Sequence, residues 1–198
     1  MALGVLCLAA ALALFISNFA DSRRAGDEAQ QRALALDAYI NRTPDPDKLT
    51  ALAPADATQD EESVVYLDGY DYIGVLEIPA LDLTLPVMST WDYDRLRLSP
   101  CRQYGSVDGG NLVIAAHNYD SHFGRLGSLI AGDAVYFTDT DGVRHGYAVD
   151  HSDVLQPTDV DRVANSGFPL TLYTCTKGGA ARVTVFCTES AESAEPTE

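Results

Sequence analysis

The sequence has little positive charge. Among its 198 residues, 13 are lysine or arginine and 29 are aspartate or glutamate, so the formal net charge is −16. Proteins that bind nucleic acid or anionic lipid headgroups gather Lys and Arg on one surface, because these side chains neutralise phosphates. The sequence therefore predicts no nucleic-acid partner, and the acidic excess indicates a soluble surface that repels other copies.

Cysteine is scarce, and its spacing argues against a metal site. Cys7, Cys101, Cys175 and Cys187 include no C-x-x-C pair and no His/Cys spacing of the zinc type. We therefore expect no metal ion. Cys101 and Cys187 are expected to be two buried thiols packed as small hydrophobes, with a disulfide between them as the alternative in an oxidising location.

Long uncharged runs are rare, and the N-terminus holds the exception. Residues 1–16 carry no charge, and the run extended to Ala20 makes about 30 Å of helix, enough to cross a bilayer. The run lacks a basic n-region and a small-residue cleavage site, which favours an uncleaved transmembrane anchor at residues 1–20 over a signal peptide. Arg23 and Arg24 follow this span, and the positive-inside rule alone would place the body in the cytoplasm.

Two further segments separate the anchor from the body. Residues 26–40 carry apolar side chains at helical spacing with acids at the front, which predicts a juxtamembrane helix. Residues 41–63 contain three prolines, four aspartates and two glutamates, and this composition predicts an extended or disordered linker. The division is therefore an anchor at 1–20, a juxtamembrane helix and linker at 21–63, a catalytic body at 64–188 and a disordered acidic tail at 189–198.

The body is predicted to be mostly β. Short β-rich runs recur with turn residues between them, which favours a small barrel or sandwich over a βαβ sheet. Strands are predicted near Tyr72–Ile78, Leu83–Val87, Leu112–His117, Ala134–Asp139, Arg144–Leu155, Leu170–Cys175 and Arg182–Cys187. Residues 92–98 and 123–130 are expected to form short helices or turns. Residues 139–142 lack the later ligands of a calcium loop and predict a hairpin turn.

The chemistry is predicted around Cys175. This residue ends the run Thr171-Leu172-Tyr173-Thr174-Cys175, Arg182 follows it by seven residues, and His117 precedes it by 58. A cysteine needs a nearby base or cation to act as a nucleophile, because the thiolate is the attacking species. Arg182 offers a permanent charge and a planar fork of N–H donors for an oxyanion. The predicted roles are therefore Cys175 as nucleophile, His117 as base and Arg182 as oxyanion donor.

His117 is preferred to the other histidines as the base. It closes a run of five apolar residues, so a central strand would hold it rigidly. His122, His145 and His151 stand in polar strand or loop segments and are expected to be solvated or capping.

The neighbours of these residues are candidates for supporting roles. Asn118 and Asp120 are candidates to orient the imidazole, and the Thr174 hydroxyl to bond a substrate carbonyl or the arginine. The backbone N–H of Thr176 is a candidate second oxyanion donor. Residues 176–181 connect Cys175 to Arg182, and a bulge there would decide whether the two side chains share a face.

The motif Thr-Leu-x-Thr-Cys with an arginine on the next strand resembles the signature of the sortases, the cysteine transpeptidases of Gram-positive cell surfaces. The segment Asn111–Asn118 is similar to the histidine strand of that family, and the resemblance extends from about Tyr72 to Cys187. It implies a closed β-barrel with short helices, preceded by the transmembrane and juxtamembrane helices. No metal or organic cofactor is implied.

The resemblance also implies an activity and partners. Cys175 would attack the threonine carbonyl of a Leu-Pro-x-Thr-Gly-like sorting motif near the C-terminus of a secreted protein and form a thioester. An amine on a peptidoglycan precursor or a pilin subunit would then receive the acyl group. This activity implies a single-pass protein of the cell membrane with an extracellular catalytic domain, against the charge evidence of Arg23 and Arg24.

Three alternatives stay open. The subclass is undecided, since a juxtamembrane helix resembles class B sortases whereas residues 151–169 are too few for the long helix that class B inserts there. A different Cys-His peptidase or acyl hydrolase would use the same chemistry, although the signature of L,D-transpeptidases is absent. A non-catalytic anchored β-domain would leave Cys175, His117 and Arg182 together without a use.

Overall fold

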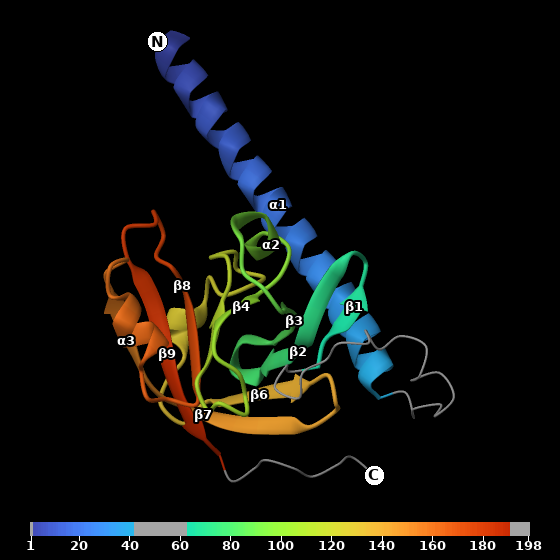
Figure 1. Cartoon of the computed structure of the whole chain (residues 1–198). Helices are drawn as coiled ribbons and strands as arrows, with labels where there is room; N and C mark the ends of the chain where they lie inside the picture. The colour runs from blue at the N-terminus through green and yellow to red at the C-terminus, as the bar shows by residue number, and fades with distance from the viewer. Residues whose placement is uncertain (1, 42–62, 191–198) are drawn as a thin grey trace.

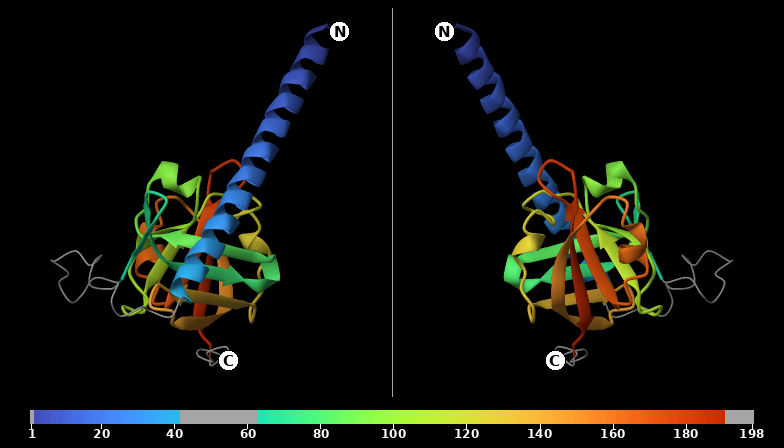
Figure 2. Two further views of the ribbon diagram at one scale, coloured as in Figure 1. Left: turned by 90° about the vertical axis from the view of Figure 1, so that its right-hand side faces the viewer. Right: turned by 90° about the vertical axis from the view of Figure 1, so that its left-hand side faces the viewer.

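Nine strands form one sheet that closes into a barrel, and a long helix runs along its outside (Figures 1 and 2). The computed structural model describes residues 2–41 and 63–190. The strands are β1 (Val65–Leu67), β2 (Tyr70–Ile78), β3 (Leu83–Met88), β4 (Cys101–Tyr104), β5 (Leu112–Ala115), β6 (Ala134–Asp139), β7 (Arg144–Leu155), β8 (Leu170–Cys175) and β9 (Arg182–Glu189). The helices are α1 (Ala2–Ile40), α2 (Tyr93–Leu96) and α3 (Val160–Ala164), with 3-10 turns at Pro79–Leu81 and Leu126–Ser128.

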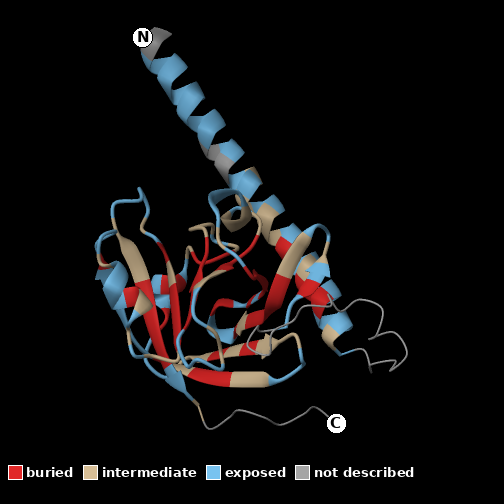
Figure 3. Cartoon of the chain, in the orientation of Figure 1, coloured by how far each residue is buried: buried red, intermediate tan, exposed pale blue. Residues whose placement is uncertain are grey.

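The strand order explains how the barrel closes. It is β1-β2-β3-β4-β5-β8-β9-β7-β6, and β2 also pairs with β6, so that β2 to β9 complete the circle. The pairs β3–β4 and β5–β8 are parallel, and the other pairs are antiparallel. The inward-facing side chains form the main hydrophobic core, which Figure 3 shows as red segments of the strands. The predicted mostly β closed barrel with short helices is confirmed.

The sequence predictions missed two strands, and both are short. β1 has three residues and pairs only with β2, while β4 has four residues and pairs with β3 at one position, Met88 with Cys101. Segments of this length show too few alternations to reveal a period of two. The remaining strands lie where the sequence placed them, except that β5 ends at Ala115, two residues before His117.

The short connections agree with the sequence. Asp92 caps α2, because its side chain accepts hydrogen bonds from the N–H groups of Asp94 (2.9 Å) and Arg95 (2.7 Å). The segment 139–142 is the turn of the β6–β7 hairpin. The predicted linker and acidic tail lie outside the described residues, except at residues 41, 63, 189 and 190, so those interpretations remain predictions.

The two helices predicted before the barrel form one continuous helix, α1. Residues 21–25 contain neither proline nor glycine, so the sequence holds no strong helix breaker at the junction. The first half of α1 is apolar and exposed, and it meets the length and hydropathy expected of a membrane span, with a mean hydropathy of 1.8. The upper part of α1 in Figure 3 is accordingly pale blue, away from the barrel.

The second half of α1 packs on the barrel. Ala29, Ala33 and Leu36 lie one turn apart along one side of the helix and are buried. Leu36 belongs to a cluster with Tyr72 and Met88, which lie on β2 and β3. The juxtamembrane segment is therefore part of the folded body.

We expect Leu36→Ala to lower the free energy of unfolding by about 2 to 5 kcal/mol, because it leaves a cavity between α1 and the barrel. Leu34→Ala is the matched control, since Leu34 lies on the same helix with 64% of its side chain exposed whereas Leu36 is 0% exposed. The control should change stability by no more than about 0.5 kcal/mol. Denaturant unfolding of the full chain in detergent measures both values, and equal effects would contradict the packing of α1.

Candidate active site

Cys175, His117 and Arg182 lie at the same edge of the barrel because β8 is hydrogen-bonded between β5 and β9. β5 and β8 run parallel with Ala115 opposite Tyr173, so both strands end at the same edge. Ala116 continues the pairing by donating its N–H to the carbonyl of Tyr173 (3.2 Å). His117 follows Ala115 by two residues, as Cys175 follows Tyr173, and the parallel register thus brings the two residues to corresponding positions.

Cys175 and Arg182 share one face of the sheet. They are directly paired in the antiparallel β8–β9 ladder, and paired residues project to the same side. The turn between them is closed by hydrogen bonds from the Thr176 N–H to the Ala181 carbonyl (2.9 Å) and from the Gly179 N–H to the Thr176 carbonyl (2.8 Å). The turn thus keeps the register, and the structure settles the question that the sequence left open.

Cys175, Arg182 and Thr174 line a groove of about 230 Å³. Its other walls carry four aromatic side chains that the sequence interpretation did not single out: Trp91, Tyr93, Tyr104 and Tyr173. These residues come from the α2 segment, β4 and β8, which are adjacent only in the folded barrel. A single sequence does not show whether an aromatic residue near the end of a strand lines a groove or packs in the core.

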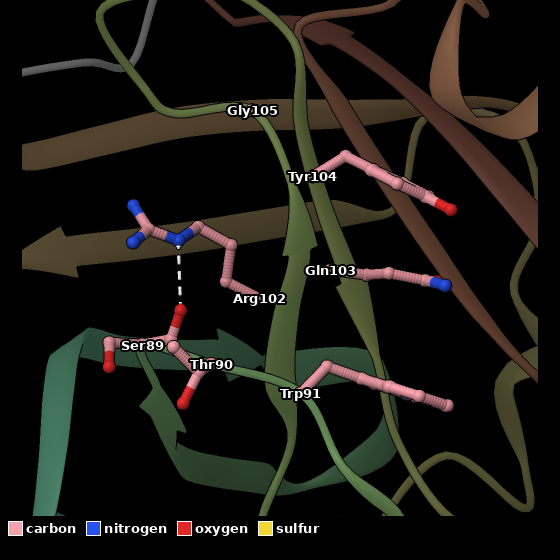
Figure 4. Close-up of a pocket in the computed structure, with 7 residues that line it drawn as sticks. All are labelled: Ser89, Thr90, Trp91, Arg102, Gln103, Tyr104 and Gly105. Carbon is pink, nitrogen blue, oxygen red and sulfur yellow. Dashed lines mark hydrogen bonds between the residues drawn. The ribbon is translucent and has the colours of Figure 1, made fainter.

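A second, larger hollow of about 550 Å³ adjoins this groove. Trp91, Gln103 and Tyr104 line both, and Figure 4 shows their side chains projecting to the same side. Arg102 projects the opposite way, and its Nε donates to the carbonyl of Ser89 (3.0 Å). The ridge formed by Trp91, Gln103 and Tyr104 therefore separates the two hollows.

Cys175 differs from the two barrel cysteines in exposure. Cys101 and Cys187 are buried free thiols, and burial raises the pKa of each to about 12. Cys175 is exposed in the groove. The expected pair of buried thiols is present, and the alternative disulfide is not formed.

His117 lies in a loop beyond the end of β5. Its imidazole stacks on the Tyr119 ring, with 4.0 Å between the ring centroids and 18° between the planes. Among the described residues, Nδ1 is buried without a hydrogen-bond partner. Burial and, to a smaller extent, the positive charge of Arg97 lower the pKa of His117, while a hydrogen bond with the Asn118 side chain opposes this shift. The imidazole is therefore neutral near pH 7, as a proton acceptor must be.

The supporting residues predicted from the sequence make specific hydrogen bonds, and the Asn118 side chain interacts with the His117 imidazole, as its predicted role requires. The Thr174 hydroxyl donates to the Ala116 carbonyl (2.8 Å) and so ties β8 to the strand before His117. The Asn118 side chain donates to the Thr176 carbonyl (3.4 Å) and joins the His117 loop to the turn after Cys175. The Thr176 N–H is committed to Ala181, which corrects its prediction as a free oxyanion donor.

Arg182 and Asp120, the other charged residues considered for the site, make hydrogen bonds to residues near them in the chain. Arg182 donates through one guanidinium nitrogen to the carbonyls of Gly179 (3.2 Å) and Ala181 (3.1 Å), which keeps its side chain at the turn beside Cys175. Asp120 is exposed, and its carbonyl accepts a hydrogen bond from Arg125 (3.4 Å).

The other histidines fall into two groups. His145 pairs with Asp139 (2.8 Å) and His151 with Asp150 (2.7 Å). Neither side chain lines the groove, and the His117 side chain lies beside the groove, next to its lining residue Ala116. His122 is fully buried, so its prediction as a solvated or capping residue was wrong. Burial lowers the pKa of His122 to about 4. The next residue, Phe123, packs in the hydrophobic core, so this part of the loop lies close to the barrel interior.

Comparison with known proteins identifies the family and the fold. The family model of the sortase domain matches residues 76–190, more than half of the chain. No curated protein sequence matches the chain.

Solved structures of sortases are similar in fold. Sortase C1 from Streptococcus agalactiae has a TM-score of 0.62 at 17% identity, with 85% of this chain and 100% of that chain covered. The sortase D5 transpeptidase from Clostridium perfringens has a TM-score of 0.60 at 18% identity, with coverages of 83% and 99%. Sortase A from Corynebacterium diphtheriae has a TM-score of 0.57 at 23% identity, with coverages of 89% and 86%.

We expect a thiol-directed electrophile to modify Cys175 well before Cys101 and Cys187, because the two buried thiols are neither accessible nor ionised at neutral pH. The experiment uses the full chain in detergent with Cys7→Ala, which removes the cysteine of the apolar helix. Peptide mass mapping over time gives the order of labelling. The unfolded chain should label at all three positions, and early labelling of Cys101 in the folded chain would refute the assignment.

Proposed function

The chain belongs to the sortase family of cysteine transpeptidases, and on that premise we propose that it cleaves a sorting motif of secreted proteins and transfers the acyl group to an amine. The expected motif is Leu-Pro-x-Thr-Gly-like. The acceptor is an amine of a peptidoglycan precursor or of a pilin subunit. The observation that carries the proposal is the pairing of Cys175 with Arg182 in the same groove, with His117 two residues beyond the end of the neighbouring parallel strand β5.

The first step forms a thioester. His117 accepts the proton of the Cys175 thiol, and the thiolate sulfur attacks the carbonyl carbon of the motif threonine. The carbonyl oxygen becomes an oxyanion, to which Arg182 donates. When the tetrahedral intermediate collapses, the bond between threonine and glycine breaks, and the glycine amine leaves with the proton from His117.

The second step transfers the acyl group. The neutral acceptor amine attacks the thioester carbon and gives its proton to His117. Collapse breaks the bond to sulfur and forms the new amide, and the Cys175 thiolate takes the proton back from the imidazolium. The same oxyanion position is used twice, so Arg182 contributes to both steps. None of these steps requires a metal ion or an organic cofactor.

The roles of the guanidinium and the imidazole follow from their surroundings. Hydrogen bonds to the turn carbonyls of Gly179 and Ala181 hold the Arg182 side chain, so it is positioned before substrate arrives. Thr174 and Asn118 act as positioning residues, because their side-chain hydrogen bonds link the strand and turn of Cys175 to the His117 loop.

The groove suits an extended peptide. Its apolar and aromatic walls at Trp91, Tyr104 and Tyr173 offer contacts for the side chains of the motif, while Gln103 and Gln156 offer amides for its main chain. The subclass and the motif sequence remain to be determined with peptides. α3 has only five residues, in keeping with the short connection before β8.

We propose that the first half of α1 is the membrane anchor and that the barrel lies outside the cell. Among the described side chains of this half, seven large apolar ones are exposed, including Leu8 and Leu14, and burial in lipid would remove them from water. The second half is packed on β2 and β3, so the barrel stands close to the membrane surface.

The transfer activity is tested with a library of short peptides carrying varied sorting motifs, triglycine as the acceptor amine, and the full chain in detergent. We expect a product in which the motif threonine is joined to triglycine. Cys175→Ala and His117→Ala should each abolish it. Arg182→Lys keeps the charge but loses the planar fork of donors, and the loss of one oxyanion donor costs roughly 10² to 10³ in rate.

The outcomes of this assay separate the alternatives. Cleavage without transfer, at any triglycine concentration, would indicate a peptidase or acyl hydrolase that uses water. Product formed by Cys175→Ala would refute the whole mechanism. Near-normal turnover by Arg182→Lys would show that positive charge alone suffices at this position.

The membrane orientation is tested by adding protease to intact cells that make the protein. We expect the barrel to be degraded while residues 1–20 stay with the membrane fraction, because the anchor is shielded by lipid. A cytoplasmic protein in the same cells should survive and serves as the control. Full protection of the barrel would place it in the cytoplasm, as Arg23 and Arg24 alone would suggest.

A further inference from the structure

The His117 main chain is held by a hydrogen bond, whereas Nδ1 of its imidazole has no hydrogen-bond partner among the described residues. The carbonyl of His117 accepts a hydrogen bond from the Phe123 N–H (3.2 Å), and Phe123 is buried in the barrel core. The Nδ1 atom, which commonly donates to a carboxylate or a carbonyl in sites of this kind, makes no hydrogen bond within the described part of the chain. The Asn118 side chain interacts with the imidazole as a hydrogen-bond partner, and a stacking contact adds a second constraint on the plane of the ring.

Tyr119 provides that contact. Its ring lies nearly parallel to the His117 imidazole, 4.0 Å away, and also packs at 60° against His122, 5.6 Å away. The Tyr119 carbonyl accepts hydrogen bonds from the N–H groups of His122 (2.9 Å) and Gly124 (2.8 Å), so the main chain of this residue is fixed as well.

Gly124 shows how tightly this loop is wound. A Cβ atom at this position would lie 2.6 Å from the Asn118 carbonyl oxygen and 2.8 Å from the Tyr119 main chain. These are main-chain atoms that cannot move aside as a flexible side chain would. The main chain is therefore closely packed between Asn118 and Gly124, and within this loop the Tyr119 ring stacks on the imidazole.

Helix α1 closes the outer side of the same loop. The Ser121 hydroxyl donates to the carbonyl of Ser22 on α1 (2.7 Å). A Cβ at Gly26 would lie 2.6 Å from the Ser121 Cβ, so the helix and the loop touch where only a glycine fits. His122 is fully buried. The main chain of Ala25 on α1 is close enough to its ring to oppose the lowering of the His122 pKa, so the ring lies beside α1.

We propose that Tyr119 is a positioning residue for the His117 imidazole and that α1, docked on the loop through Ser22 and Gly26, holds Tyr119 in place. The inference rests on the proposed function, because it assigns His117 the proton transfers. It makes the helix that carries the membrane anchor a support of the active site. Cys175 and Arg182 do not depend on this support, since the β8–β9 ladder holds them.

The first test compares Tyr119→Leu with Tyr119→Phe in the full chain in detergent, using the transfer reaction to triglycine. Leucine removes the ring that stacks on the imidazole, whereas phenylalanine keeps it. We expect Tyr119→Leu to lower kcat by up to about 100-fold, the cost of misplacing a reacting group by about 1 Å, with little change in KM. Tyr119→Phe should keep kcat close to that of the unchanged chain.

A second readout observes the imidazole without any reaction. In a chain with Cys175→Ala and isotope-labelled histidines, the His117 ring protons should resonate upfield because they lie over the Tyr119 ring. Tyr119→Leu should remove that shift and raise the pKa of His117 towards its ordinary value of 6.5, since burial is the main cause that lowers it. Arg97 and His122, the other ionisable groups that interact with this ring, are unchanged in the variant.

The contribution of α1 is tested with two glycine-to-alanine exchanges on the same helix. Gly26→Ala forces the Cβ against Ser121, whereas a Cβ at Gly4 meets no atom within 4 Å. We expect Gly26→Ala to lower kcat and to change the His117 resonances as Tyr119→Leu does, and Gly4→Ala to change neither. Combining Gly26→Ala with Ser121→Gly removes the clash together with the Ser121–Ser22 hydrogen bond, so both readouts should recover only in part.

Each result decides one part of the inference. Unchanged kcat and unchanged His117 resonances in Tyr119→Leu would overturn the positioning role, and so would a Tyr119→Phe variant as impaired as Tyr119→Leu. Unchanged readouts in Gly26→Ala would overturn the role of α1. If the unchanged chain made no transfer product, the proposed function would fail, while the resonances of His117 in the Cys175→Ala chain would still decide the role of Tyr119.

Discussion

The structure depends on the position of β8, which is hydrogen-bonded to β5 on one side and to β9 on the other. The parallel β5–β8 pair brings the ends of two strands to one edge, and the antiparallel β8–β9 pair returns the chain to that edge seven residues later. Parallel strands need a long connection, and here β6, β7 and α3 supply it while they complete the barrel. The same strand pairings therefore close the barrel and bring the candidate site residues together.

Helix α1 extends this arrangement beyond the barrel. Its second half buries Ala29, Ala33 and Leu36 against the strands, and Ser22 and Gly26 contact the loop after His117. The exposed apolar half continues the same helix without a break. A membrane-bound first half would thus fix the distance and the tilt of the groove relative to the lipid surface, because no flexible hinge separates the two.

Nearby charges and burial determine which cysteine thiols of the barrel can ionise and react. The chain has a net charge of −16, yet the site has Arg182 beside Cys175 and Arg97 acting on His117. Burial keeps the thiols of Cys101 and Cys187 protonated. Among the barrel cysteines, Cys175 alone combines exposure with a paired arginine, which makes it the candidate nucleophile.

The sequence by itself determined the parts that depend on local pattern. The Thr-Leu-x-Thr-Cys run, the arginine seven residues later and the apolar run before His117 predicted the candidate site. Alternation identified the longer strands, because each strand repeats its period several times within a few residues. The apolar run at residues 1–20 was also recognisable, because it is a continuous local feature of the sequence. Only the tertiary structure decided what depends on contacts between distant segments. It joined the two predicted helices into α1, placed His122 in the core, committed the Thr176 N–H to Ala181 and stacked Tyr119 on the imidazole. A loop residue takes its role from the surfaces that the barrel and α1 bring against it, and a single sequence contains no period or spacing that records those surfaces.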